Sequence, residues 1–179
     1  SYVQFFTNSV DTRTTGVDIV ATYAKNLAGG MLNTSLALNV NNMTIDRVYT
    51  NDQLAGKEDS YFGRREQLFL LASAPPMKAN VGLNYTKGKW FASLRGTYFD
   101  QVIIEDWVGT DDVYDARLTL DLSLSYALGA KLRATVGVNY LTDQLPTFQD
   151  SETETGGMYD AVQMGTMGRF FFGRITYSL

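Results

Sequence analysis

Hydrophobic and polar residues alternate along several stretches of this chain. In residues 118–126 every second position is apolar without interruption. Residues 79–85 repeat the pattern, with Asn80, Gly82 and Asn84 between the apolar positions. A period of two is typical of β-strands, whose side chains point alternately to opposite faces of a sheet. The sequence therefore predicts a sheet with one apolar wall and one polar wall.

The pattern recurs often enough to predict an all-β fold, an antiparallel meander of about eight strands. The predicted strands cover residues 2–7, 16–23, 31–42, 78–85, 90–99, 116–126, 132–141 and 169–179. Short connections at 24–30, 86–89 and 127–131 alternate with long ones at 43–77, 100–115 and 142–168. All short turns then lie at one rim and all long loops at the other, as in an outer-membrane β-barrel.

Aromatic residues gather on the apolar wall beside the short turns or near the C-terminus. They are Tyr23, Tyr85, Trp90, Tyr126 and Tyr177. Rings with one polar end are favoured at the boundary between lipid and water. Strands also contain such residues for their β-propensity alone. Five of them on one face at one rim favour an aromatic girdle at a membrane interface.

Charge and composition bear on which wall faces outward. The short turns carry Lys25, Lys87, Lys89 and Lys131 and no acidic residue, whereas the long loops carry many acids. The polar wall is made mainly of Asn, Ser and Thr rather than the Lys and Glu of a soluble exterior. This favours an apolar wall in lipid and a polar wall around a water-filled lumen. A soluble β-barrel that binds an apolar ligand inside would have the walls reversed.

Several function classes are disfavoured by what the chain lacks. The 179 residues suit one domain and contain no histidine and no cysteine. Catalysis and metal binding through histidine are therefore excluded. The sequence also has no zinc-binding spacing, phosphate-binding glycine loop or nucleophile elbow. A net charge of -4 disfavours nucleic acid as a partner. We expect no enzyme, no cofactor and no metal site, and no transmembrane helix.

Several segments, taken in order, resemble TonB-dependent outer-membrane receptors. Residues 8–23, NSVDTRTTGVDIVATY, are similar to the start of a barrel strand in that family, with Gly16-Val17-Asp18 at its glycine–apolar–acid position. Residues 62–67 and 74–80 resemble a late loop and the strand after it, and 138–143 resemble the "NLFD" strand end. Residues 168–179 resemble the closing strand, which usually ends in Phe where this chain has Leu179.

This resemblance implies that residues 1–179 form a C-terminal segment of a barrel of about 22 strands, without the plug domain. The start at Ser1, in mid-strand, suggests an excised piece. The implied function is uptake of a scarce nutrient, such as a ferric siderophore or cobalamin, in the bacterial outer membrane. The implied partners are outer-membrane lipid, the plug and remaining strands, TonB through the plug, and the small nutrient ligand.

The long loops contain four residues that could contact such a ligand: Tyr61, Arg64, Arg65 and Trp107. Guanidinium groups bind carboxylates well, and aromatic rings add stacking surface. The alternative for the arginines is pairing with Glu66 or with lipopolysaccharide phosphates. The alternative for Trp107 is packing within its loop or an outer aromatic girdle.

Other charged residues receive structural interpretations. Arg95, Asp121, Arg133 and Arg174 fall on the predicted lumen wall, where we expect pairing across strands or with the plug rather than substrate conduction. The acidic pair Asp111-Asp112 and the acids at 150–154 lack the spacing of a calcium loop, so we interpret them as solvated. A complete small eight-stranded outer-membrane protein with a structural or adhesive role remains an alternative.

Overall fold

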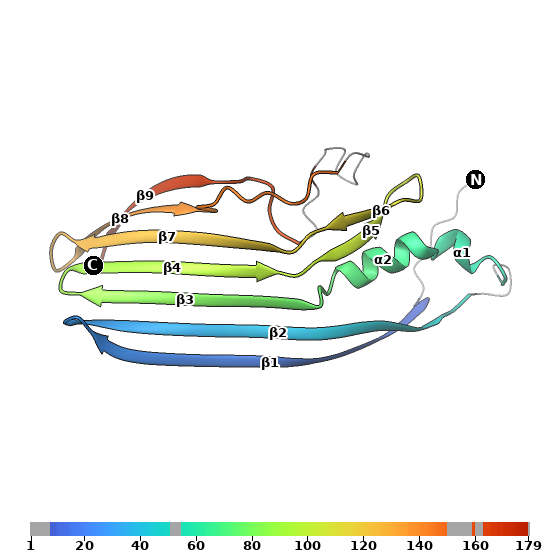
Figure 1. The fold of residues 1–179 in the computed structure, drawn as a ribbon, viewed down its shortest axis with the longest axis horizontal. Coiled ribbons are helices and arrows are strands. Elements are labelled where there is room, and N and C mark those ends of the chain that lie inside the picture. The colour runs from blue at the N-terminus through green and yellow to red at the C-terminus, as the bar shows by residue number, and fades with distance from the viewer. Residues whose placement is uncertain (1–7, 51–54, 150–158, 160–162, 179) are drawn as a thin grey trace.

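The chain folds mainly into one curved antiparallel sheet. The structure is a computed structural model, and it describes residues 8–50, 55–149, 159 and 163–178. Seven strands follow one another in the order β1-β2-β3-β4-β7-β8-β9 (Figure 1). Their bounds are β1 Val10–Leu27, β2 Gly30–Val48, β3 Met77–Lys87, β4 Trp90–Phe99, β7 Arg117–Ala127, β8 Leu132–Asn139 and β9 Phe170–Tyr177. The predicted all-β meander is confirmed, and the predicted strand at 2–7 lies outside the described residues.

The strand register keeps the two walls separate. Leu94 pairs with Leu122, Leu122 with Val138, and Val138 with Phe171, which makes one apolar row across four strands. The apolar wall is open to the surroundings, since Ile175 is 76% exposed and Val136 is 63% exposed. A soluble barrel would bury such a wall. The described residues therefore do not support the soluble-barrel alternative.

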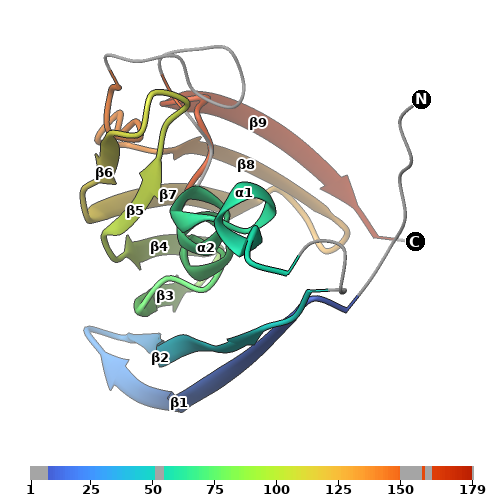
Figure 2. The same cartoon turned by 90° about the vertical axis from the view of Figure 1, so that its right-hand side faces the viewer.

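The sheet is an open arc (Figure 2), with β1 and β9 at its two edges. Its concave face is the polar wall. Ser93 and Arg95 of β4 line the same cavity as Phe172 and Arg174 of β9, although β7 and β8 lie between these strands. Side chains three strands apart can meet over a cavity only on the concave side. The described strands thus do not form the closed eight-stranded barrel of a complete small protein.

The hairpin of β1 and β2 is longer than the alternation predicted. These strands contain 18 and 19 residues, whereas about 9–11 suffice to cross a membrane. The predicted strands at 16–23 and 31–42 were therefore too short. The apolar alternation stops, but the hydrogen-bonded ladder continues and is joined by an ion pair of 2.7 Å between Arg13 and Asp46.

Two segments that we expected to be loops contain regular structure. Residues 43–77 include α1 (Glu58–Tyr61) and α2 (Arg64–Ala72). Residues 100–115 include a hairpin of β5 (Val102–Glu105) and β6 (Asp111–Tyr114). Helix α2 lies beside this hairpin at the long-loop end of the sheet (Figure 1).

A small apolar core joins α2 to the hairpin. It consists of Ala72, Val102, Ile104 and Tyr114, with Phe69 packed against it. Tyr114 is completely buried. Neither helix in the described part of the chain is long and apolar enough to cross a membrane. The long-loop end is thus a packed layer with its own core.

The last two strands are shorter than predicted. Strand β8 ends at Asn139, because Tyr140 has a positive φ of 51°. The backbone N–H of Tyr140 leaves the ladder and donates to Asp121 Oδ1 at 3.0 Å. Strand β9 covers Phe170–Tyr177 rather than the whole of 169–179.

Candidate functional site

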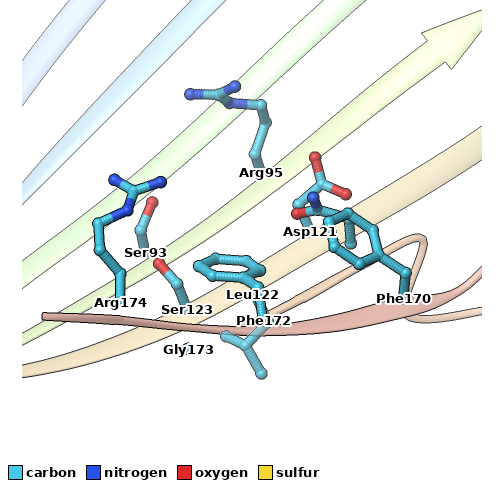
Figure 3. A pocket seen from close by; sticks show the side chains of 10 residues that line it. Ser93, Arg95, Asp121, Leu122, Ser123, Phe170, Phe172, Gly173 and Arg174 are labelled. Carbon is cyan, nitrogen blue, oxygen red and sulfur yellow. The ribbon is translucent and has the colours of Figure 1, made fainter. Parts of the chain in front are cut away.

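The concave wall holds a polar cavity of about 500 Å³ (Figure 3). It is lined by Ser93, Arg95, Asp121, Leu122, Ser123, Asn139, Phe170, Phe172, Gly173 and Arg174. A neighbouring cavity of about 520 Å³ shares Phe172 and Arg174 with it and adds Lys131 and Arg133. The four charged residues predicted for the lumen wall, Arg95, Asp121, Arg133 and Arg174, therefore do lie on one wall, and each lines at least one of these two cavities.

The arginines of this wall are not neutralised by the one nearby carboxylate. Arg95 and Asp121 are register partners on β4 and β7, but no ion pair joins them in the described structure. Asp121 accepts a hydrogen bond from the Tyr140 backbone instead. Arg174 lies 5.9 Å from the centre of the Phe172 ring. The wall therefore presents exposed guanidinium groups beside aromatic rings, a surface suited to anionic groups.

At the long-loop end, Arg64 clamps α2 to the β5–β6 hairpin. Its guanidinium donates to Glu105 Oε2 at 2.7 Å and to Asp111 Oδ2 at 2.8 Å. A further hydrogen bond joins it to Asp111 Oδ1. These bonds raise the pKa of Arg64, with the Asp111 bond as the larger cause. The Arg64 hydrogen bond likewise lowers the pKa of Asp111, so this carboxylate stays charged at a lower pH than an ordinary aspartate.

Arg65 lies next to this clamp and stacks on aromatic rings. Its guanidinium carbon is 3.7 Å from the centre of the Trp107 ring and 4.9 Å from that of Phe69. Its Nη1 is also 3.8 Å from Glu66 Oε1, a partner that the sequence had suggested. Trp107 stands in the turn between β5 and β6, so this stack is a second link between helix and hairpin.

The structure thus brings together three of the four predicted ligand-binding residues: Arg64, Arg65 and Trp107. Tyr61 is engaged elsewhere, since its hydroxyl donates to the backbone oxygen of Tyr49 at 3.0 Å. Desolvation raises the pKa of Tyr61. All four residues therefore have partners within the protein, and their contact with a ligand stays a prediction.

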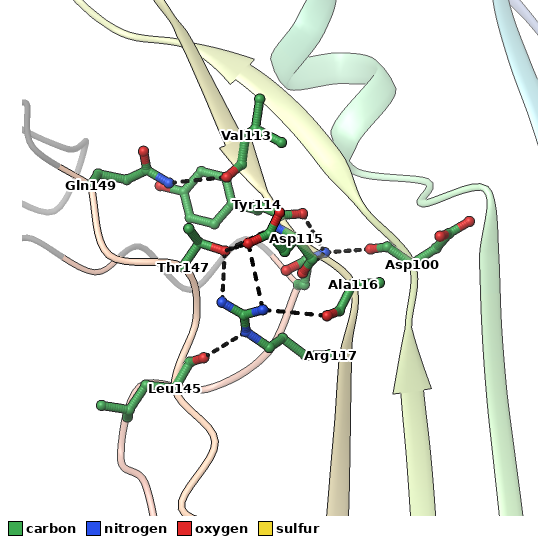
Figure 4. Close-up of polar contacts among 10 residues, drawn as sticks. Asp100, Val113, Tyr114, Asp115, Ala116, Arg117, Leu145, Thr147 and Gln149 are labelled. Carbon is green, nitrogen blue, oxygen red and sulfur yellow. Dashed lines mark hydrogen bonds and ion pairs between the residues drawn. The ribbon is translucent and has the colours of Figure 1, made fainter.

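A third group of contacts fixes the loop after β8, and sequence reasoning missed it (Figure 4). Arg117 donates to the backbone oxygen of Leu145 at 3.1 Å and to Thr147 Oγ1 at 3.0 Å. Thr147 Oγ1 also accepts the backbone N–H of Asp115 at 2.9 Å. The contacts between Arg117 and this loop span about thirty residues of sequence, and no local pattern announces them.

The predicted girdle residues lie on the apolar wall at the short-turn end. Trp90 and Tyr126 are register partners on β4 and β7, with ring centres 4.6 Å apart. Tyr177 lies on the edge strand β9, opposite Leu132 of β8, and is 61% exposed. Their role at a membrane interface stays a prediction.

The predicted solvated acids have mixed outcomes. Asp111 is held by Arg64, and Asp112 is buried at 5% exposure, so neither is simply a solvated loop acid. The acids at 150–154 lie outside the described residues. Within the described ranges, no group of three potential metal-ligating side chains comes together.

Comparison with known proteins defines the class of this fold. Residues 1–141 match the family model "TonB dependent receptor-like, beta-barrel", and the chain belongs to this family of receptor barrels. No curated protein sequence matches it. The family and the solved structures below are receptors or transporters by name.

Two solved structures have similar folds. The copper transporter OprC is 18% identical with a TM-score of 0.57, over 95% of this chain and 24% of that protein. The pyoverdine outer membrane receptor FpvA from Pseudomonas aeruginosa PAO1, bound to pyoverdine, is 14% identical with a TM-score of 0.54, over 95% and 22%. The chain thus spans about a quarter of these structures and shares their fold.

Proposed function

We propose that this chain forms barrel wall and extracellular loops of a TonB-dependent receptor that imports a scarce nutrient through the bacterial outer membrane. The observation that carries the proposal is the division of one curved sheet into two walls. The apolar wall is exposed on the convex side, and the polar wall with its arginines lines the concave side. That division matches a barrel with lipid outside and water inside.

The concave wall serves mainly to hold the plug domain of the receptor. Arg95 and Arg174 are exposed and have no carboxylate partner in the described part of the chain. A plug with surface carboxylates would supply those partners inside the lumen, where an isolated charge needs water or a counter-charge. We assign these arginines to docking of the plug rather than to conduction of substrate.

The long-loop layer serves as the outer ligand surface. Arg64, Arg65 and Trp107 sit on a packed unit of α2 and the β5–β6 hairpin, so a ligand would meet a preorganised surface. Preorganisation lowers the entropy cost of binding. The favoured ligand is an anionic metal chelate such as a ferric siderophore, whose oxygen anions would replace Glu105 or Asp111 at the exposed Arg64 guanidinium. Cobalamin is the second candidate.

Uptake by a receptor-deletion strain tests this proposal. The strain would be complemented with the complete receptor and given radiolabelled ferric siderophore or radiolabelled cobalamin, with and without a functional TonB. We expect TonB-dependent accumulation of the siderophore. Accumulation of cobalamin alone would correct the ligand, and accumulation of neither would overturn the nutrient-import function.

A further inference from the structure

A lysine-rich patch stands at the short-turn rim, on the side of the apolar wall. Strand β3 ends at Lys87, and Lys89 follows in the two-residue turn to β4. Residues 24–30, 86–89 and 127–131, which make up the three short turns, contain four lysines and no acidic residue. Charges at this rim therefore have no carboxylate of their own turns to pair with.

The two ammonium groups are placed by specific contacts. Lys87 Nζ donates to the backbone oxygen of Ala28, in the adjacent turn between β1 and β2, at 2.8 Å. An ammonium has three donors, so two remain for a ligand. Lys89 Nζ lies 6.0 Å from the ring centre of Tyr126, which itself contacts Trp90. Lys89 thus lies beside the aromatic rings, and Lys87 is held at the adjacent turn.

The same strands carry an apolar depression further along the exposed wall. It has a volume of about 230 Å³ and is lined by residues of β3, β4 and β7. Gly96 of β4 is one of them, and it has no side chain to fill the space. Gly96 is about 20 Å along β4 from Trp90 at the usual rise per residue. A strand tilt of about 40° makes this about 15 Å of depth, half of a hydrocarbon core of about 30 Å. An acyl chain held at the rim reaches that depth.

The geometry points to a binding site for an anionic phospholipid on this face. Its phosphate lies at Lys87 and Lys89, its glycerol region at Trp90 and Tyr126, and one acyl chain along β4 toward Gly96. Short turns face the periplasm in barrels of this kind, so the lipid belongs to the inner leaflet. The site goes beyond nutrient import and rests on the membrane orientation proposed above.

Trp90 provides a local reporter for the test. The complete receptor is placed in bilayers of phosphatidylcholine with a minor fraction of phosphatidylglycerol, or of phosphatidylethanolamine, brominated near the glycerol. Bromine quenches tryptophan fluorescence, and the quenching is measured in the receptor and in its Trp90→Phe variant. The difference between the two is the quenching of Trp90 alone, without that of other tryptophans. Each lysine near an anionic surface gives an enrichment of about fivefold at low salt. We therefore expect several-fold stronger quenching by phosphatidylglycerol.

A double variant and a matched control decide the role of the lysines. K87Q/K89Q should remove the preference and make the two lipids equal. K57Q/K78Q removes the same charge from the long-loop end, where Lys57 precedes α1 and Lys78 lies at the start of β3, and should keep the preference. Equal quenching of the wild-type receptor by both lipids, or equal loss in both double variants, would overturn the site while leaving the membrane orientation intact. Quenching by neither lipid would overturn both.

Discussion

The guanidinium of Arg65, on α2, stacks on the ring of Trp107, in the turn between β5 and β6, with its central carbon 3.7 Å from the ring centre. Trp107 is 67% exposed, so this stack lies at the surface, and it meets the buried core through Phe69, which Arg65 also contacts. A cation over an exposed aromatic face contributes about 0.5–1 kcal/mol. The contact therefore tunes the order of the loop layer and leaves the sheet unaffected.

Replacing the ring of Trp107 tests this role. Trp107→Ala removes the stack, and we expect faster amide hydrogen exchange at residues 102–114 by up to about fivefold, which corresponds to about 1 kcal/mol. Trp107→Phe keeps an aromatic face and should retain most of the protection. Exchange in β3 and β4 is the internal control. Equal acceleration in those strands would contradict a local role.

The Arg64–Asp111 pair stabilises the loop layer, and this stabilisation is lost only when the pH falls below the ordinary range for an aspartate. The hydrogen bond from Arg64 lowers the pKa of Asp111 below its ordinary value of 3.8. The folded state therefore binds this proton less readily than the unfolded state does. The stabilisation is complete above pH 3.8, decreases below it, and is lost once the pH falls below the folded-state pKa.

A pH titration of Trp107 fluorescence measures this dependence. The signal is the difference between the receptor and its Trp107→Phe variant. We expect a constant signal from neutral pH down to about pH 4 and a transition only below it. Asp111→Asn should abolish that transition, whereas Asp59→Asn, on α1, should preserve it. A transition near pH 5 in the unmodified receptor would contradict the lowered pKa.

The sheet could be predicted from the sequence because a period of two is a local signal. Residues 78–85 and 90–99 were placed correctly within a few residues. The sequence RREQLFLLA of α2 contains mostly good helix formers, but the absence of apolar alternation led us to interpret it as loop. The partners of Arg64 on this helix, Glu105 and Asp111, are 41 and 47 residues away in the sequence. At that separation, no pattern in a single sequence indicates which charged residues will pair.

The loop core gives a stronger prediction at Tyr114. This side chain is completely buried among residues of α2 and β5. Tyr114→Ala should cost the loop layer about 3–5 kcal/mol, the usual penalty for removing a buried aromatic side chain. Limited proteolysis should then cut within residues 55–75 and 100–115, while the sheet stays resistant. Tyr114→Phe preserves the ring volume and should be cut far more slowly.

Gly137 allows a test of the concave wall. A Cβ at this position would lie 2.5 Å from the Phe172 ring and 2.9 Å from the backbone oxygen of Leu122. Gly137→Ala must therefore displace Phe172, and overpacking of this kind costs about 1–3 kcal/mol. Gly129→Ala is the matched control, because nothing lies within 4 Å of its Cβ. Urea unfolding of the two variants should separate them, and equal stability would contradict the close approach.

Charge reversal on the concave wall tests the assignment of Arg95 and Arg174 to the plug. R95E/R174E places two carboxylates where we propose that the plug supplies its own, and like charges at such a contact repel. We expect the plug to become accessible to protease in the purified receptor and nutrient uptake to fall at least tenfold, with ligand affinity nearly unchanged. Arg13→Glu, on the exposed extension of β1, reverses a charge that lies away from both cavities and is the control. If ligand affinity fell while the plug stayed protected, the arginines would belong to the substrate path.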